Sequence, residues 1–243
     1  MKKTLAIAAL AALIATPALA ADLSRPMYTK APPPPPPFSW TGCFVGGNGG
    51  GLFGRKEWTS ATVGTAGLPI GSHDADSWMA GVQAGCDYQF MGTWVIGIQG
   101  DYDWTDATGT NLDQIAIGDT DRTHIKNIAS LTGRIGYGWN QFLGYVRGGG
   151  AWVRDDYDVF VTATGAPAAS ASETRSGWTI GVGGEYAFAP WVSGFVEYDH
   201  YEFGTSRNTF ITPAGGVFGV ADIDQHVDVV KAGINFRFAP WVH

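Results

Sequence analysis

A serine, two histidines and an acid lie close together near the end of the sequence and could form a hydrolytic site. These residues are His200, Glu202, Ser206 and His226. A serine nucleophile needs a base within hydrogen-bond reach and a further group that orients the base, and the spacing of these residues requires neither contact. The sequence contains no Walker loop, HExxH or CxxC motif, and no helix pattern follows its glycine runs. We therefore expect no catalysis, no metal site and no cofactor.

Other charged residues stand at alternate positions of segments that are otherwise apolar and aromatic. Asp101 and Asp103, for example, flank Tyr102. Charges buried on one face of a closed sheet must be paired and hydrogen-bonded, so this pattern predicts an internal ion-pair network. Its expected members are Asp87, Gln99, Asp101, Asp103, Arg134, Arg147, Glu185, Glu197, Asp199, Lys231 and Arg237.

Such a network allows two functions. In a salt-bridged plug, the acids pair with the bases and fill the interior, which side chains can do in a barrel of eight strands. In a narrow polar channel, opposing charges line a constriction. Inward glycines such as Gly181, Gly183 and Gly233 would leave space for the channel. We favour the plug and retain the channel as the alternative.

The elements that position these residues are predicted strands. In residues 77–90, the even positions from Trp78 to Phe90 are apolar or aromatic and the odd positions are mostly polar. This two-residue period is typical of a strand with one apolar face. Similar segments give eight expected strands: 40–51, 77–90, 94–104, 127–139, 142–152, 177–188, 191–201 and 230–238.

The connections between these strands alternate in length. Short breaks fall at 91–93, 140–141 and 189–190, whereas long, polar breaks span about 52–76, 106–126, 153–175 and 202–224, which we expect to be loops. The pentapeptide Phe-Ala-Pro-Trp-Val begins at Phe188 and again at Phe238. This repeat suggests a succession of hairpins. The acidic long connections are expected to be solvated, and they are where binding of a host or surface ligand would reside.

Eight such strands fit either a soluble sandwich or barrel, with apolar residues inside, or a transmembrane barrel, with apolar residues outside. Aromatic residues gather at the strand ends, as in the interfacial girdles of membrane barrels. Strands of this length can also cross a bilayer at a tilt. We therefore predict an all-β, eight-stranded antiparallel up-and-down transmembrane β-barrel with short periplasmic turns and four long extracellular loops.

The composition agrees with a membrane protein. Of the 243 residues 35 are glycine and only 15% are charged, whereas soluble domains average about 7% glycine and about 25% charged residues. Hydrophobic residues make up 45%, which excludes disorder for the bulk of the chain. The net charge of −7 argues against nucleic acid as a partner.

The first residues form a predicted export signal. Lys2 and Lys3 precede an apolar run, and Ala18-Leu19-Ala20 fits the small-x-small cleavage rule. We expect a signal peptide at 1–20, a proline-rich periplasmic leader at 21–39, the barrel at 40–238 and a C-terminal tail at 239–243. The leader acts as either a spacer or a disordered segment, because six consecutive prolines favour an extended rod that cannot join a sheet.

The two cysteines lie near the periplasmic ends of the first two strands. Pairing Cys43 with Cys86 across an antiparallel ladder sets Trp40 opposite Gln89, which is a sensible hairpin register. Because the periplasm is oxidising, we predict a disulfide, with two buried free thiols as the alternative.

The chain resembles the small outer-membrane β-barrel family of Gram-negative surface antigens, also described as porin-like or outer-membrane immunogenic proteins. Segments 40–48, 81–85 and 98–101 and the last strand carry the resemblance, which covers nearly the whole mature chain. Lys231-x-Gly233-x-x-Phe236-x-Phe238 resembles the C-terminal signal read by the barrel-assembly machinery. In most such barrels the final aromatic residue ends the chain, whereas residues 239–243 follow it here.

The resemblance implies a monomer in the cell outer membrane that contacts lipid, lipopolysaccharide and the assembly machinery. We expect a non-catalytic protein of envelope integrity and surface exposure. A narrow, low-conductance porin for small solutes is the alternative. A lipid A-modifying enzyme, built on the histidine and serine residues named above, is a more distant one.

Overall fold

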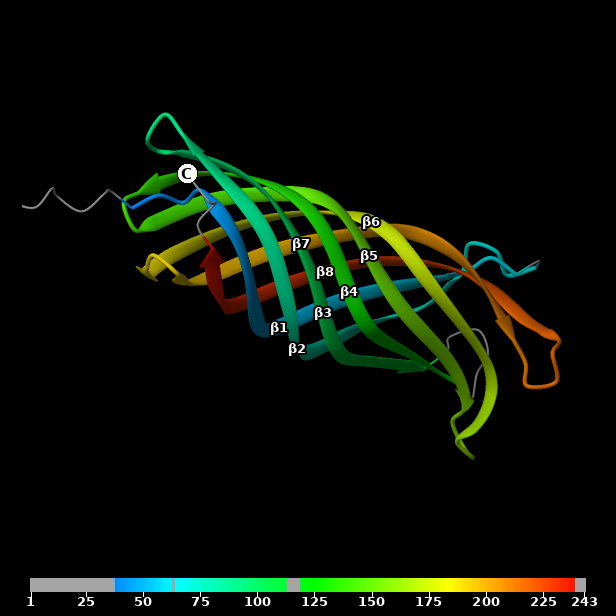
Figure 1. Cartoon of the computed structure of the whole chain (residues 1–243). Coiled ribbons are helices and arrows are strands. Elements are labelled where there is room, and N and C mark those ends of the chain that lie inside the picture. The colour runs from blue at the N-terminus through cyan, green and yellow to red at the C-terminus, as the bar shows by residue number, and fades with distance from the viewer. Residues whose placement is uncertain (1–37, 63, 113–118, 239–243) are drawn as a thin grey trace, which may run out of the picture. The chain divides into compact units, whose positions relative to one another are not determined.

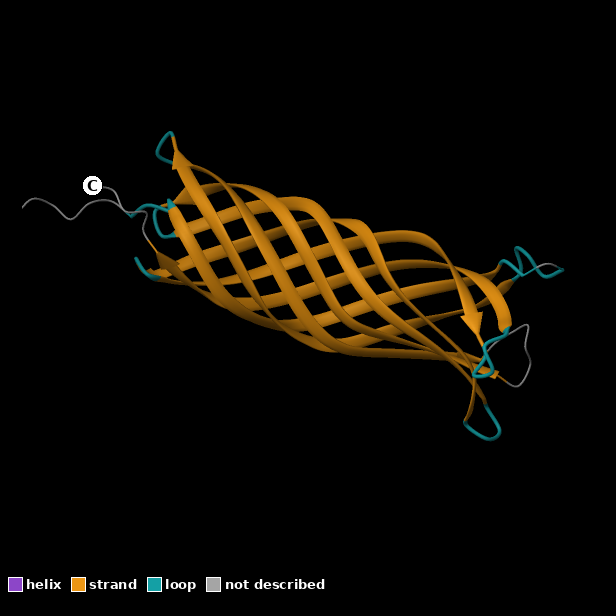
Figure 2. Cartoon of the chain, turned by 45° about the vertical axis from the view of Figure 1, so that its right-hand side comes forward, coloured by secondary structure: helices purple, strands orange, loops and turns teal. Residues whose placement is uncertain are grey.

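Eight antiparallel strands form a closed barrel in the computed structural model, which describes residues 38–62, 64–112 and 119–238. Each strand pairs with its neighbour in sequence, and the last strand pairs with the first (Figures 1 and 2). This confirms the predicted architecture. The strands are β1 (Gly42–Ser60), β2 (Pro69–Phe90), β3 (Trp94–Leu112), β4 (Asp119–Trp139), β5 (Phe142–Val161), β6 (Ala166–Ala189), β7 (Val192–Ile211) and β8 (Val217–Phe238).

The strands are much longer than the sequence pattern predicted, and the expectation of long loops is wrong for most of the residues concerned. The segments 52–60, 69–76, 106–112, 119–126, 153–161, 166–175, 202–211 and 217–224 are strand. In β1 the inward side chains Leu52, Lys56 and Trp58 are all buried beyond the point where we expected the strand to end. The inner face therefore continues the core, while the outer face turns polar because it leaves the apolar belt.

The outer surface carries an apolar belt between two levels of exposed aromatic residues. Trp78, Trp104, Trp152 and Trp178 stand at one level; Tyr88, Trp94, Trp139 and Phe188 stand at the other, beside the short turns. Between the two levels, exposed aliphatic side chains such as Val82, Ile98, Leu131, Val182 and Val196 cover the surface. This arrangement matches a barrel that faces lipid with its outer side. No helix of the described ranges is long and apolar enough to cross a membrane.

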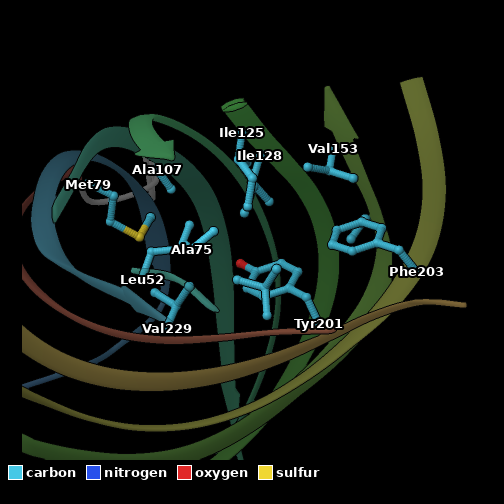
Figure 3. Packing of buried hydrophobic residues seen from close by; sticks show 12 residues of the cluster. Leu52, Ala75, Met79, Ala107, Ile125, Ile128, Val153, Tyr201, Phe203 and Val229 are labelled. Atoms are coloured by element: carbon cyan, nitrogen blue, oxygen red, sulfur yellow. The ribbon is translucent and has the colours of Figure 1, made fainter. Parts of the chain in front are cut away.

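The interior is filled by apolar and polar layers that alternate along the barrel axis. Near the short turns, Trp40, Val95, Leu143, Tyr145 and Ala187 pack together. Further along, a second apolar layer draws residues from most of the strands (Figure 3), and it comprises Leu52, Ala75, Met79, Ala107, Ile125, Ile128, Ala151, Val153, Tyr201, Phe203, Val227 and Val229. A third layer at the far end contains Trp58, Ile70, Tyr157, Val159, Ala169, Phe210, Ala221 and Ile223. Charged side chains lie between these layers.

The N-terminal and C-terminal predictions fall almost entirely outside the described residues. The signal peptide, most of the leader and the tail at 239–243 remain predictions. At the edge of the described range, Phe38 packs edge-on against Trp40 with the ring centres 5.0 Å apart. Trp40 lies outside β1, although we placed it in the first strand, because its backbone N–H donates to the Gln89 side chain and not to a neighbouring strand. Its side chain is fully buried.

Candidate functional site

The lumen carries the largest group of buried charges, and all ten charged residues predicted for the network lie in it, at most 6% exposed. Inward and outward positions alternate along each strand, so the register of the closed ladder places these charges on one inner surface. Gln99, the neutral member of the predicted set, is also buried there.

The first charge cluster lies near the periplasmic end and joins two arginines to two acids. Arg134 donates from Nε to Asp87 Oδ1 at 2.7 Å and also contacts Glu185 at 3.4 Å. Arg237 donates to Asp87 Oδ2 at 2.8 Å and to Glu185 Oε1 at 3.0 Å. Ser193 donates a further hydrogen bond to Glu185. Each acid therefore accepts hydrogen bonds from two cations, which offsets the cost of burying the charges.

The second cluster lies deeper in the lumen around Arg147 and Lys231. Arg147 binds Asp199 through Nε and a terminal nitrogen at 2.8 and 3.0 Å, and it donates to Asp101 at 2.8 Å. Lys231 Nζ lies 3.1 Å from Asp101, 3.2 Å from Glu197 and 3.4 Å from Asp199. Tyr145 donates to Glu197 at 2.8 Å. Through Gln99, which bonds to both Arg134 and Asp101, the first two clusters form one packed network.

The inward glycines favoured a channel in the sequence analysis, but neighbouring side chains take the space beside three of them. A Cβ atom built on Gly183 would lie 2.5 Å from the Tyr145 ring, and one on Gly233 would lie 2.7 Å from the Phe195 ring. The space at Gly181 holds the Asp199 carboxylate. The space beside these glycines is therefore taken by aromatic side chains and by a carboxylate that pairs with Arg147, and this part of the interior is filled.

A third charge cluster lies in the part of the barrel beyond the level of Trp78, Trp104, Trp152 and Trp178. The sequence analysis missed it. Lys56 Nζ lies 3.0 Å from Asp155, and both side chains are fully buried. Arg175 donates to Gln225 and to the carbonyls of Gly204 and Ile223. These residues were assigned to loops. The signal that could have found them is the two-residue alternation of Leu52, Lys56 and Trp58, which continues past the expected strand end.

Burial governs the protonation of this third cluster. The loss of water around Lys56 lowers the pKa of its amine to about 8, against the opposing attraction of Asp155. The same burial, together with the Asp155 charge, raises the pKa of the neighbouring Tyr157. The Lys56 amine also lies 4.8 Å from the centre of the Tyr157 ring. The side chains of this cluster are thus tightly packed. The cluster lies outside the membrane-spanning part of the barrel.

Three of the candidate hydrolytic residues, His200, Glu202 and His226, lie together on the outer face, but Ser206 does not join them. His200 points outward and its Nδ1 lies 2.8 Å from Asp228 Oδ1. Ser206 lies on the inner side of the sheet, where it hydrogen-bonds to Glu173. Glu202 and His226 are on the outer face, with the His226 ring centre 6.4 Å from that of His200. Serine and histidine are therefore separated by the sheet. The described residues contain no group of three or more His, Cys, Asp and Glu that could hold a metal ion.

The two cysteines form a disulfide between neighbouring strands. Cys43 of β1 and Cys86 of β2 are ladder partners, and their sulfur atoms are 2.08 Å apart. Gly42 pairs with Asp87 in the same register, and the backbone N–H of Trp40 donates to the Gln89 side chain at 2.7 Å. The bond joins the first hairpin on its lipid-facing side.

The residues of the assembly signal divide between the two faces of β8. Lys231 is buried in the lumen network, whereas Phe236 and Phe238 are about half exposed on the outer belt. β8 pairs with β1 from Cys43–Phe238 to Ser60–Ala221. The motif thus lies on the strand that closes the barrel.

Comparisons with known proteins agree with this architecture. A family model described as an outer membrane protein beta-barrel domain matches residues 6–238. A 31 kDa outer-membrane immunogenic protein of Brucella melitensis is 28% identical over 97% of this chain and 100% of its own length. A 25 kDa outer-membrane immunogenic protein of Brucella abortus is 28% identical over 70% of this chain and 68% of its own. Among solved structures, the outer membrane protease OmpT of Escherichia coli is similar with a TM-score of 0.54 and 8% identity, covering 83% of this chain and 98% of its own. At that identity the similarity concerns the fold alone.

Proposed function

This chain belongs to the outer-membrane β-barrel protein family, and we propose that it is a closed, non-catalytic barrel that contributes to envelope integrity and displays its outer end as a surface antigen. Localisation in the outer membrane follows from the family and from the outer-membrane relatives. The relatives named as immunogenic support the surface role.

The observation that carries the proposal is the filled lumen. Between Trp40 and Trp58, three apolar layers and three charge clusters fill the lumen, and a solute would have to displace all of them. Conducting pores instead keep a continuous polar path wide enough for water. A structural role therefore accounts for the interior better than the porin alternative does.

Two arguments support the absence of catalysis. Ser206 and His200 lie on opposite faces of the sheet, so these two residues cannot form a serine–histidine–acid site together. The most charged part of the chain consists of paired acids and bases that are sealed from substrate. Similarity to a protease with 8% identity extends to the fold and brings no catalytic residues with it.

Single-channel recording in a planar bilayer tests the closed lumen. The purified full chain should insert without discrete openings, and folding is checked by the heat-dependent mobility of the barrel in detergent gels. Arg134→Ala should be silent too, because two apolar layers lie beyond the cluster that it weakens. Reproducible openings of the wild-type protein would contradict the proposal and favour the porin.

A cellular experiment tests the envelope and surface roles. Cells that lack the protein should become more sensitive to detergent, and restoring the gene should reverse this sensitivity. Antibodies raised against the β5–β6 turn at 162–165 should bind intact cells. Unchanged detergent sensitivity together with no antibody binding would remove both parts of the proposed function.

A further inference from the structure

A cavity lies on the outer surface of the barrel, where the pairing of β6 with β7 is interrupted. The ladder between these strands stops at Trp178–Glu202 and returns only at Ser170–Ile211. Over the same length, β6 stays paired with β5, and β7 with β8. The cavity at the outer end of this interruption, which we call the seam cavity, has a volume of about 630 Å³, typical of a ligand site. Its polar lining includes Arg154, Asp158, Ser170, Ser172, Asn208 and Thr209.

The seam cavity lies just beyond the membrane, beside the lipid. On the outer face of β5, Arg154 and Asp158 follow Trp152 by two and six residues, and Trp152 belongs to the aromatic level at that end of the apolar belt. At ~3.3 Å per residue and a strand tilt of ~40°, the cavity is roughly 5–15 Å beyond this level. In the outer leaflet of a Gram-negative outer membrane, this layer is occupied by the sugars of lipopolysaccharide.

The polar side chains around the seam cavity are not used by the barrel itself. Within the described ranges, neither Arg154 nor Asp158 takes part in an ion pair or a side-chain hydrogen bond, and the three hydroxyl groups of the lining form no side-chain hydrogen bond either. Arg122, the ladder partner of Asp158 in β4, stacks on the Phe160 ring instead. The lining therefore keeps its donors and acceptors available for a ligand.

Asn208 adds a buried donor to this lining. It lies on the inner side of β7, opposite Ala221 of β8, and is only 6% exposed. Its Nδ2 atom is buried and has no hydrogen-bond partner among the described residues. Asn208 nevertheless lines the cavity together with the outward residues Ser172 and Thr209, so the cavity extends into the wall at the interrupted ladder. A buried amide nitrogen in this position calls for an acceptor.

The charges around the seam cavity balance, which narrows the class of ligand. Asp156 pairs with Lys126, and the single charges of Arg154 and Asp158 have opposite signs. Such a lining attracts neither an anion nor a metal cation strongly. Guanidinium, amide, carboxylate and hydroxyl groups together offer both donors and acceptors, which suits a ligand with many hydroxyl groups. Ile211, 39% exposed, adds an apolar contact.

We propose that the seam cavity binds a neutral saccharide. The sugar hydroxyls donate to the Asp158 carboxylate and accept from Arg154 and Asn208, and hydrogen bonds that involve a charged group are the stronger ones. Such sugars could come from the lipopolysaccharide around the barrel or from a soluble glycan, and the position of the cavity beside the lipid favours lipopolysaccharide. The inference goes beyond the proposed function, since it depends on the location in the outer membrane and not on a closed lumen.

Saturation-transfer NMR tests the site with the purified full chain in a detergent that has no sugar headgroup. The first probe is the lipid-free oligosaccharide released by mild acid from the lipopolysaccharide of the source strain. The second probe is maltotriose, a soluble glycan unrelated to that membrane. We expect transfer from the protein to the first probe. Transfer to the first probe alone assigns the site to lipopolysaccharide, and transfer to both assigns it to neutral saccharides in general.

Two substitutions locate the binding in the seam cavity. Asp158→Ala removes an acceptor, and Ser172→Phe fills the space. Each should raise the Kd of the oligosaccharide by about tenfold or more, as expected for a lost hydrogen bond to a charged group or a blocked site. Asp74→Ala is the matched control, because it removes an exposed acid from β2, outside the cavity lining, and should bind like the wild type.

Asn208→Leu separates a role in binding from a role in the fold. It should weaken binding by about tenfold. The sugar-free barrel should keep its resistance to urea, because Nδ2 has no partner to lose. Wild-type affinity combined with a loss of stability would show that the amide serves the fold, and this result would contradict the proposed contact.

Three results would overturn the proposal. The first is no transfer from the wild-type protein to either sugar. The second is equal affinity in the wild type, Asp158→Ala and Ser172→Phe. The third is displacement of the oligosaccharide by inorganic phosphate, with this displacement lost in Arg154→Ala. In the third case, the cavity is an anion site.

Discussion

The guanidinium carbon of Arg237 lies 4.8 Å from the centre of the Trp40 ring, and the same side chain donates a hydrogen bond of 2.7 Å to the Trp40 carbonyl. The contact joins the last strand to the residues that precede the first. Trp40 Nε1 also donates to the Asn140 carbonyl at 3.1 Å in a periplasmic turn. Trp40 therefore connects the segment before β1, the last strand β8 and the β4–β5 turn at the periplasmic end of the barrel, which we call the periplasmic mouth.

Replacing Trp40 by alanine should lower the free energy of unfolding by about 3–5 kcal/mol, because a fully buried aromatic side chain and its cavity are involved. Urea unfolding in detergent, followed by tryptophan fluorescence, measures this loss. Met91→Ala, at an exposed position of the neighbouring turn, should change the stability by less than about 0.5 kcal/mol. Equal effects of the two substitutions would show that Trp40 does not stabilise the mouth.

Removing Arg134 should destabilise the barrel strongly, because Asp87 and Glu185 lose a buried partner. Losses from breaking a buried pair are about 3–5 kcal/mol. The matched control is Arg207→Ala, which breaks the exposed pair with Asp222 and should lower the stability far less, because solvent screens an exposed ion pair. The two variants are compared by the same unfolding measurement. Similar losses would mean that the lumen network contributes little to stability.

Lys56 should make stability depend on pH in a defined window. The pKa of its amine is about 8 in the folded protein and 10.5 in the unfolded chain. Between these values the unfolded chain binds more protons, so raising the pH stabilises the fold. Relative to Lys56→Met, the wild-type protein should gain about 2 kcal/mol between pH 8 and pH 10. The comparison cancels other titrating groups such as Tyr157, and a constant difference between the two proteins would contradict the assignment.

The Cys43–Cys86 bond should stabilise the first hairpin without being required for the fold. Replacing both residues by alanine keeps the β1–β2 ladder and should cost about 2–4 kcal/mol, as is typical of a disulfide that closes a loop. Denatured protein from outer membranes should show free thiols only after reduction. Two reactive thiols without reductant, or a double variant as stable as the wild type, would contradict this prediction.

How far the sequence predicts the structure can be judged from particular residues. The alternation from Trp78 to Phe90 identified a lipid-facing strand, because the two-residue period assigns each side chain to a face. The same period placed Asp101, Arg147 and Lys231 in the lumen. Local pattern therefore determined the class of fold, the facing of the strands and the buried charges of the first two clusters.

The sequence pattern did not determine where the strands end. The outer face becomes polar outside the membrane and resembles a loop in sequence, whereas the inner face at Lys56 and Trp58 still packs against distant strands. The extension is stabilised by contacts between residues far apart in the chain, such as Lys56 with Asp155, and no local signal reports them.

Only the tertiary structure decided which charges pair and whether the lumen is filled. Closing β8 onto β1 brings Arg237 to Asp87, and the barrel register brings Lys231 among four acids. Pairing and filling depend on distances across the barrel, which the order of residues along one strand does not contain. The sequence by itself determined a lipid-facing barrel with a charged interior, and the three-dimensional packing determined which of those charges pair and which side chains fill the space between them.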